Sequence, residues 1–492
     1  MKKRFRLISL FLSLIMLVSS FVGCGGATSE KTTEEQGVES TAAVSEGHTS
    51  EETTEAEFKP DVEQKNYGED FYVSVMTDVN GLAHYWVKES ENEIMSDAVY
   101  ARQENIRRYL GVEMYGSGTE AESRYIEPFK TAVKNKDDSV HLLITHTYYG
   151  IDGFITGNYV LDFNDVPEIN LEAPYWKLDF MEDVGINGRL FLGFSDYSLL
   201  SSQVITFNKE LLEKYSDQLD ESLYSMVYNY RWTLDKMIWL ASLAYIDTNA
   251  DGKTPDDSFG LTGYQSVPFV GFMQACDIKV VDLDESGNYV VGFYMENTKQ
   301  KMSDLVDKMY ALTRSEYACI NDKFDYPGLT SGRVLMQFER TGPLINFVAA
   351  DIDFGILPYP MYNELQKDVG YRSLNWSGYQ VIPSYLENPE MVGDTIEMLA
   401  YFSKDVSVAY YEKLLGKKVA DAPDDRNMLD IVWDGICSDM GQTFFSVIIG
   451  TNALYVLPNL TKEGTTQNLA SYVAMHQNTI NRNFKKFMAH FK

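Results

Sequence analysis

Short stretches of strand-forming residues alternate with longer stretches of helical spacing along most of this sequence. The first five read strand, helix, strand, helix, strand, over residues 71–76, 93–110, 112–115, 122–134 and 140–145. This order predicts a mostly parallel sheet covered by helices. Further strands are expected over residues 189–193, 203–207, 259–263, 334–338, 354–357 and 380–383. We therefore expect an α/β protein.

The chain is too long for a single hydrophobic core. About 425 residues follow a polar N-terminal stretch, whereas single cores stop growing at roughly 250–300 residues. Two lobes are therefore expected, one over residues 67–205 plus 376–415 and the other over residues 206–375 plus 416–492. Thr233 and Asn388 are placed to cap helices, and apolar residues at helical spacing predict a long closing helix from Leu469 onward.

The N-terminus reads as an export signal over residues 1–23. Basic residues precede an apolar run over residues 7–18, which is shorter than the ~20 residues that a membrane-spanning helix needs. Gly23 and Cys24 resemble a bacterial lipobox, although Phe21 departs from its usual Leu. We expect a lipid on Cys24, which would anchor the protein to the outer face of the cytoplasmic membrane. An ordinary signal with a free cysteine is the alternative.

Residues 24–66 are expected to form a disordered linker. From residue 27 to 57 they are almost only Ser, Thr, Glu, Ala and Gly, without an aromatic ring. Such a segment cannot bury enough apolar area to offset its ordering entropy. The linker would hold the folded part about 35 Å from the membrane if it behaves as a flexible coil.

The net charge limits the possible partners, and the number of cysteines limits the possible disulfides. A net charge of −30 would repel phosphate groups, so neither nucleic acid nor an anionic lipid surface is expected as a partner. Beyond Cys24 only Cys276, Cys319 and Cys437 remain, too few and too widely spaced for a disulfide framework. Buried free thiols are favoured, and one disulfide between two of these three cysteines is the alternative.

One acidic loop matches the beginning of a calcium-binding loop. Oxygen ligands stand at alternate positions, with Gly252 at the sharp turn. Position twelve is Ser258 instead of an acid, so Asp257 would have to serve in a shortened loop. A solvated turn is the alternative, and no other cofactor is required. The expected ligands are Asp247, Asn249, Asp251, Lys253 and Asp257.

No arrangement of residues indicates catalysis. The six histidines do not form a metal-binding set, and the Gly-x-Ser-x-Gly motif of many hydrolases is absent. With 72 acidic residues, pairs of carboxylates arise by chance and carry no information about glycosidase chemistry. The sequence therefore favours a protein that is not an enzyme.

Several loose patterns occur together in one order over most of residues 67–440. They lie at residues 96–100 with Arg102, 187–191, 207–212, 232–236, 247–260, 354–360 and 425–429. In this order they resemble the family 1 extracellular solute-binding proteins, the carbohydrate-type lipoprotein receptors of ABC importers in Gram-positive bacteria. The resemblance implies a two-lobed, type II periplasmic-binding-protein-like fold with a solute in the cleft and a closing hinge. It also implies a monomer that docks on ABC permease subunits.

Clefts in such folds lie beyond the carboxyl ends of the strands, which selects the candidate contact loops. Carboxylates there could accept hydroxyl hydrogen bonds, an arginine could donate a fork, and Tyr or Trp rings could stack on a sugar. For each residue the alternative is a turn cap or local packing. The candidates are Asp78, Asn80, Tyr148, Tyr149, Asp196, Tyr197, Ser198, Gln265, Glu339, Arg340, Trp376 and Tyr379.

The expected function is capture of a small solute, in particular a mono- or oligosaccharide, and its delivery to an ABC importer. Peptide or another polar solute is the alternative within this class. A surface hydrolase or glycan-adhering lipoprotein is the alternative from another class. The identity and size of the solute cannot be read from the sequence, because hydroxyl partners lie on loops far apart along the chain.

Overall fold

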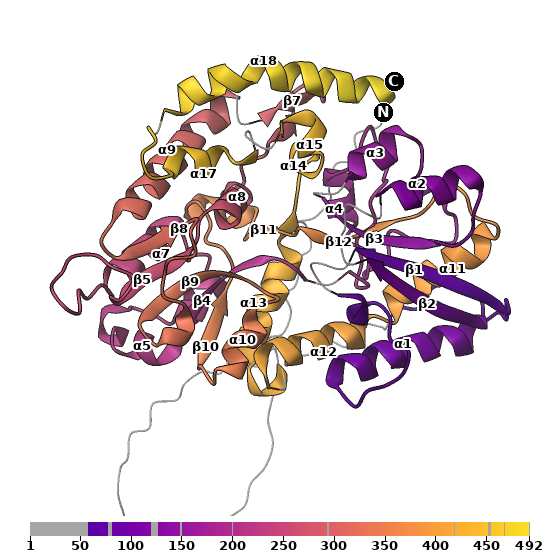
Figure 1. Ribbon diagram of the computed structural model, residues 1–492, viewed down its shortest axis with the longest axis horizontal. Coiled ribbons are helices and arrows are strands. Elements are labelled where there is room, and N and C mark those ends of the chain that lie inside the picture. The colour runs from indigo at the N-terminus through magenta and orange to yellow at the C-terminus, as the bar shows by residue number, and fades with distance from the viewer. Residues whose placement is uncertain are drawn as a thin grey trace, which may run out of the picture. The chain divides into compact units, whose positions relative to one another are not determined.

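Two β-sheets organise the folded part of the chain (Figure 1). The computed structural model describes residues 58–491, except 77–80, 120–125, 148–149, 199, 293–294, 418, 451–453 and 467. Residues Phe58–Lys492 form one compact unit. The predicted signal, Cys24 and the linker up to residue 57 lie outside the described residues. Among those described, no helix combines the length and the apolar composition that crossing a membrane requires.

The four-stranded sheet has the strand order β12-β3-β1-β2. Strands β1, β2 and β3 are parallel, and β12 runs antiparallel beside β3. Alternate residues Phe71, Val73 and Val75 of β1 are buried in the core, as the apolar run predicts. Helices α11 and α12 pack against α1. The elements of this lobe are β1 (Glu69–Met76), α1 (Ile94–Leu110), β2 (Val112–Thr119), α2 (Ile126–Asn135), β3 (Leu142–His146), α3 (Ile151–Thr156), α4 (Leu178–Asp183), β12 (Ser377–Val381), α11 (Pro389–Tyr401) and α12 (Lys404–Leu415).

The five-stranded sheet has the strand order β10-β4-β9-β5-β8. Strands β5, β8 and β9 are parallel, whereas β4 runs antiparallel to both β9 and β10. This lobe contains β4 (Gln203–Asn208), α5 (Lys209–Glu213), α6 (Leu223–Tyr228), α7 (Leu234–Ser242), β5 (Phe259–Tyr264), α8 (Ser266–Ala275), α9 (Glu296–Arg314), β8 (Ala318–Asn321), β9 (Val334–Arg340), α10 (Leu344–Ala349), β10 (Phe354–Leu357) and α13 (Pro423–Asp434). The α/β class with parallel-rich sheets is therefore confirmed.

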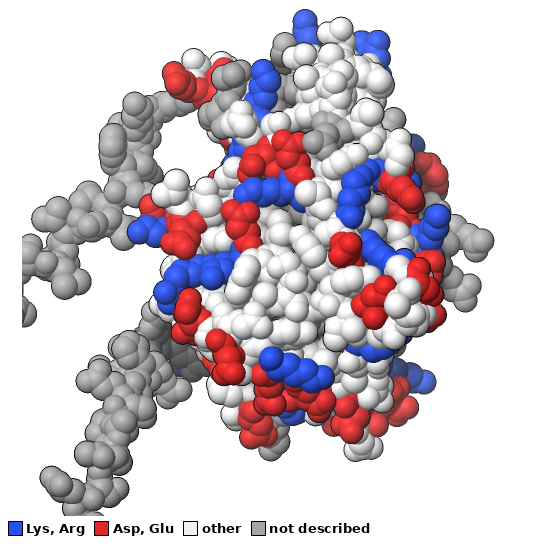
Figure 2. Space-filling view, turned by 90° about the vertical axis from the view of Figure 1, so that its left-hand side faces the viewer, with Lys and Arg blue, Asp and Glu red and all other residues white. Residues whose placement is uncertain are grey.

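Small strand pairs and C-terminal helices complete the second lobe. The strand pairs are β6 (Val281–Leu283) with β7 (Tyr289–Val291), and β11 (Ser373–Leu374) with β13 (Ile436–Cys437). The helices are α14 (Met440–Thr443), α15 (Phe445–Ile448), α17 (Val456–Thr461) and α18 (Leu469–Met488). Figure 2 shows acidic and basic side chains next to one another over much of the face on the left of Figure 1. Lys308 Nζ of α9 and Asp235 Oδ1 of α7 form an ion pair of 2.7 Å.

Segments that pass between the lobes are hydrogen-bonded to one another. The Asn375 carboxamide oxygen accepts from Ser201 N at 2.7 Å and from Ser202 Oγ at 3.1 Å. Thr341 N donates to Ser202 O at 3.0 Å, which ties the end of β9 to the start of β4. These residues lie before β4, after β9 and before β12, so the crossing segments meet at one place. The residue numbers predicted for the lobe boundaries stay a prediction.

Several local predictions are confirmed and others are corrected. Thr233 and Asn388 cap α7 and α11, and Leu469, Ile480 and Phe487 form the buried face of α18. Residues 189–193 form only isolated bridges, Arg189 with Ile186 and Gly193 with Gln380, instead of the expected strand. The strand expected over residues 380–383 ends at Val381, close to Pro383, which has no N–H to donate to a sheet.

Two further findings concern the cysteines and the first residue of the folded part. Cys276, Cys319 and Cys437 are free and buried, so no two of them are bridged. The folded part begins no later than Phe58, and not at residue 67 as expected, because residues 58–66 pack against the four-stranded lobe. Val62 is buried, Lys65 N donates to Tyr109 O, and Lys65 Nζ pairs with Asp394 Oδ2 at 2.8 Å.

Candidate functional site

The parallel strands β5, β8 and β9 end at the same edge of the five-stranded sheet, and aromatic rings gather there. The ring of Tyr264, the last residue of β5, lies parallel to Phe324 with centroids 4.5 Å apart. Tyr326 follows, its centroid 6.5 Å from that of Phe324. Phe324 is 67% exposed, which leaves its outer face open to a ligand. We call Tyr264, Phe324 and Tyr326 the aromatic platform.

A polar turn holds Phe324 in this position. Phe324 has a φ of 58°, a left-handed backbone conformation that bulky residues rarely adopt and that indicates local strain. Asn321, the last residue of β8, accepts from Lys323 N and Asp325 N through Oδ1 and donates through Nδ2 to Asp325 O. Such strain is tolerated where the surroundings impose it, and it is concentrated at functional sites. An exposed phenyl ring built at this cost is a candidate ligand contact.

Glu339, near the end of β9, adds a carboxylate next to the platform. Thr262 of β5 pairs with Gln337 of β9, so Tyr264 and Glu339, each two residues further along these parallel neighbouring strands, lie on the same face of the sheet. Burial, with a smaller contribution from Glu339, raises the pKa of Tyr326 to about 12. Burial also raises the pKa of Glu339 itself. A carboxylate beside an aromatic face can accept hydroxyl hydrogen bonds from a sugar ring stacked on that face. The predicted contact of Glu339 with a solute stays a prediction.

Arg340 connects this edge with the other lobe. Burial, with a smaller contribution from the positive charge of Arg340, lowers the pKa of His146 to about 3. His146 ends β3 and Arg340 ends β9, and the positive charge of Arg340 opposes protonation of the buried imidazole. Trp376 stacks on His146 with centroids 6.2 Å apart and an interplanar angle of 13°. The indole is only 4% exposed, so its expected role as the floor for a sugar ring would require the cleft around it to open.

Four of the predicted contact residues are buried and hydrogen-bonded within the protein. Tyr197 donates to Tyr85 O, Ser198 to Gly378 O, Gln265 to Thr461 Oγ1 and Tyr379 to Asn375 O. All four are almost completely inaccessible in this structure, and their contact with a solute stays a prediction. Of the four, only Gln265 directly follows a strand, and the sequence could not tell inward from outward side chains. Asp78, Asn80, Tyr148 and Tyr149 lie outside the described residues.

Asp196 lies in a different environment from the aromatic platform. The charged groups that act on its carboxyl are Lys177, Lys404 and Asp434, which lie in or next to α4, α12 and α13. Burial raises the pKa of Asp196 to about 7, against the opposing effect of the two lysines. Asp196 therefore gains and loses its proton near neutral pH. Its role as a solute contact stays a prediction.

The platform was missed in the sequence because β8 was not predicted. Without a strand over residues 318–321, the following loop had no reason to be placed at the sheet edge. The signal that could have found it is the pair Phe324 and Tyr326 in an otherwise polar segment that ends at Pro327 and Gly328. Two aromatic residues in a loop of turn-forming residues are costly to expose unless they bind something.

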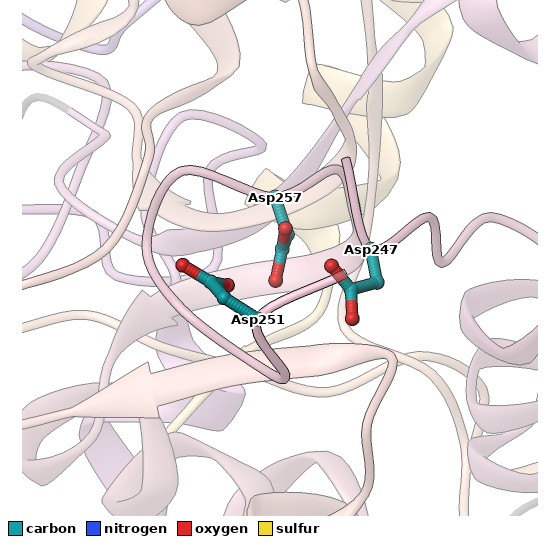
Figure 3. Close-up of side chains that lie close together, drawn as sticks. All are labelled: Asp247, Asp251 and Asp257. Carbon is teal, nitrogen blue, oxygen red and sulfur yellow. The ribbon is translucent and has the colours of Figure 1, made fainter. Parts of the chain in front are cut away.

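The acidic loop lies at the opposite end of β5. Oxygen atoms of Asp247, Asp251 and Asp257 all lie within 4.8 Å of one another, inside a single loop (Figure 3). Asp247 also accepts from the backbone N–H groups of Ala250 and Gly252, and the Asn249 side chain bonds to Asp251. The Lys253 side chain points elsewhere, because its Nζ donates to Ser315 O. Three clustered carboxylates fit a hard cation such as Ca²⁺.

Calcium is expected to bind this loop weakly and to stabilise the second lobe without touching the solute. Asp257 is the weak point of the ligand set, because its carboxylate is already used by Thr248 and Thr254. Titration calorimetry with Ca²⁺ should give a dissociation constant of roughly 10⁻⁵–10⁻³ M, and Asp251→Asn should abolish the heat. Submicromolar binding would contradict this prediction, and no binding would leave a solvated turn.

Comparisons with solved structures identify the fold. No protein-family model matches the sequence, and no curated protein is similar enough in sequence to count as a relative. The structure is similar to the GacH receptor of Streptomyces glaucescens, solved unliganded and with acarbose, with a TM-score of 0.52 and 13% identity over 85% of this chain and 98% of that one. It is also similar to the maltose/maltodextrin-binding domain MalE of Bdellovibrio bacteriovorus bound to maltotriose, with a TM-score of 0.50 and 13% identity over 85% and 100% of the two chains.

A third similar structure is an ABC substrate-binding protein of Listeria monocytogenes in complex with cycloalternan. Its TM-score is 0.53 and its identity is 10%, over 85% of this chain and 99% of that one. All three likenesses extend over nearly the whole of the solved chains. At these identities the likeness shows the fold alone. The chain described here therefore has the two-lobed, periplasmic-binding-protein-like fold of ABC substrate-binding proteins.

Proposed function

We propose that this chain is an extracytoplasmic solute-binding lipoprotein that captures an oligosaccharide and delivers it to an ABC importer. The observation that carries the proposal is the aromatic platform beside Glu339, at the sheet edge where solutes bind in such folds. An exposed aromatic face supplies stacking area, and the carboxylate supplies hydrogen-bond acceptors. The solved structures of this fold named above were determined with acarbose, maltotriose and cycloalternan, which supports a glycan as the solute class.

Titration calorimetry against a panel of neutral oligosaccharides tests this proposal. Maltotriose, cellotriose and xylotriose are suitable probes because they differ in linkage and in hydroxyl positions. At least one should bind, and ligand at a hundred times its dissociation constant should stabilise the fold by about 2.7 kcal/mol. Binding of peptides, with no response to any glycan, would overturn the sugar assignment. Hydrolysis of the bound glycan would instead favour a surface hydrolase.

Delivery to an importer has its own test. Deletion of the gene should abolish uptake of the labelled oligosaccharide that the purified protein binds. Uptake that continues at the same rate would leave a surface protein that adheres to glycans without transporting them.

The lipid anchor is tested separately from solute binding. Cys24→Ala should release the protein from the membrane of a Gram-positive host into the medium, because the predicted signal offers no other acceptor for the lipid. Cell fractionation and immunoblotting measure the distribution, with the wild type as the membrane-bound control. A variant that stays as membrane-bound as the wild type would contradict the anchor.

A further inference from the structure

Gln337 in β9 has an orientation that its neighbours fix. Its side chain is only 6% exposed, and its Oε1 accepts from the backbone N–H of Leu329 at 2.6 Å. A backbone N–H can only donate, so the oxygen of the carboxamide must face Leu329. The Nε2 group is then directed to the Glu339 carboxylate, where it donates to Oε2 at 3.0 Å.

Both oxygens of the Glu339 carboxylate therefore accept a hydrogen bond from the protein and still have acceptor positions free. Oε1 accepts from Arg340 N at 2.9 Å, and Oε2 accepts from Gln337. An ionised carboxylate offers about four acceptor positions, so about two stay open. Within the described part of the chain, no Lys or Arg side chain lies within ion-pair distance of Glu339, although the Arg340 guanidinium contributes an electrostatic attraction. When ionised, this carboxylate on the same face of the sheet as Tyr264 is negative and accepts hydrogen bonds only.

We infer that Gln337 is a positioning residue, which fixes Glu339 so that this site selects a neutral sugar with adjacent hydroxyls and rejects one that carries a carboxylate. Two neighbouring hydroxyls of such a ring can each donate to one Glu339 oxygen while the ring stacks on the platform. A uronic acid would bring a second negative charge to a partly desolvated carboxylate, and like charges in such a site repel strongly. The inference rests on the proposed function and names the substrate class of the same site.

Gln337→Leu tests the positioning role, because leucine keeps the volume but removes the donor. Gln366→Leu is the matched control, because Gln366 is also 6% exposed and its carboxamide is also hydrogen-bonded, to Ala275 O and Tyr362 N. Calorimetry with maltotriose and with trigalacturonate, from pH 4 to pH 8, is the measurement. Thermal unfolding of each variant shows how much stability each substitution costs.

We expect the wild type to bind maltotriose and to bind trigalacturonate at least tenfold more weakly. Gln337→Leu should lose about tenfold in maltotriose affinity at pH 7, since a hydrogen bond to a charged group is lost. Its affinity should also begin to fall at a higher pH than that of the wild type, because the carboxylate has lost a donor that stabilises its charged form. Gln366→Leu should lose stability but keep the affinity and pH profile of the wild type.

Each contrary result has a distinct meaning. Equal or tighter binding of trigalacturonate would overturn the selection of neutral rings. An unchanged pH profile in Gln337→Leu, or an equal loss of affinity in both variants, would overturn the positioning role. If the wild type binds neither probe but binds another neutral glycan, that glycan replaces maltotriose in the comparison of the three proteins, and the same outcomes apply. Binding to no glycan would overturn the proposed function itself, and this inference with it.

Discussion

Replacing Phe324 with alanine is expected to weaken oligosaccharide binding by about tenfold to a hundredfold while the protein stays folded. The ring lies parallel to Tyr264 on the exposed platform and is 67% exposed, so its removal costs little packing in the free protein. In the complex its outer face would be covered by a sugar, and such a contact typically contributes ~1–3 kcal/mol. Calorimetric titration of the glycan that the wild type binds measures the difference.

Met475→Ala is the matched control for this experiment. Met475 is 72% exposed and lies on α18, so its loss removes a similar amount of exposed apolar surface away from the platform. Its affinity should equal that of the wild type. Unchanged affinity in a folded Phe324→Ala protein would mean that the platform does not bind the solute, and Trp376 would become the main candidate for stacking.

Asp196→Asn is expected to stabilise the protein at pH 8 by up to about 4 kcal/mol and to have almost no effect at pH 4, because a tenfold change in proton affinity corresponds to about 1.4 kcal/mol. The pKa of Asp196 is raised to about 7 from its ordinary 3.8, chiefly by burial. The folded state therefore holds the proton more tightly than the unfolded chain. Stability is lost as pH rises from about 4 to about 7, and the full cost is present above pH 7. Asparagine avoids this cost at every pH.

Thermal unfolding of both proteins across this pH range measures the effect, and Asp439→Asn provides the contrast. The pKa of Asp439 is also raised, to about 6, but its carboxylate accepts from the backbone N–H groups of Val280, Val281, Gly441 and Gln442. The Oδ1 of asparagine could still accept from Val281, Gly441 and Gln442, but its Nδ2 would face the N–H of Val280, so Asp439→Asn should destabilise the protein at both pH values. An Asp196→Asn protein that is no more stable at pH 8 than the wild type would show that Lys177 and Lys404 offset the burial of its charge.

The strands that were predicted correctly are those whose apolar residues can be buried only inside a sheet. Phe71, Val73 and Val75 must be buried, and only the interior of a sheet between helices accommodates such a run. The same reasoning fails for the loops, because polar and aromatic residues there have two solutions. Tyr197 packs inside against the Arg102 guanidinium, 4.5 Å from its ring centroid, whereas Phe324 stays outside. The choice depends on contacts between residues far apart in the sequence.

The candidate site depends on such distant contacts even more than the fold does. Phe324 reaches its position only because Asn321 hydrogen-bonds the turn and Tyr264 supports the ring from another strand. The orientation of the Glu339 carboxylate depends on hydrogen bonds from the Gln337 side chain and from the backbone N–H of Arg340. The sequence placed Glu339 and Arg340 at a strand end, since the apolar run before them is clear. It gave no means of joining that end to residues 264 and 324.

The position of β12 in the four-stranded sheet determines when that sheet can form during synthesis. Tyr379 of β12 pairs with Thr145 of β3, about 230 residues earlier in the chain. Ribosomes add ~5–20 residues per second, so β3 waits roughly 10–50 s for its neighbour, with one edge unpaired. Loops of this length close slowly, and an unpaired edge is a place where chains aggregate or are held by chaperones. The four-stranded sheet can therefore be completed only after most of the chain has been made.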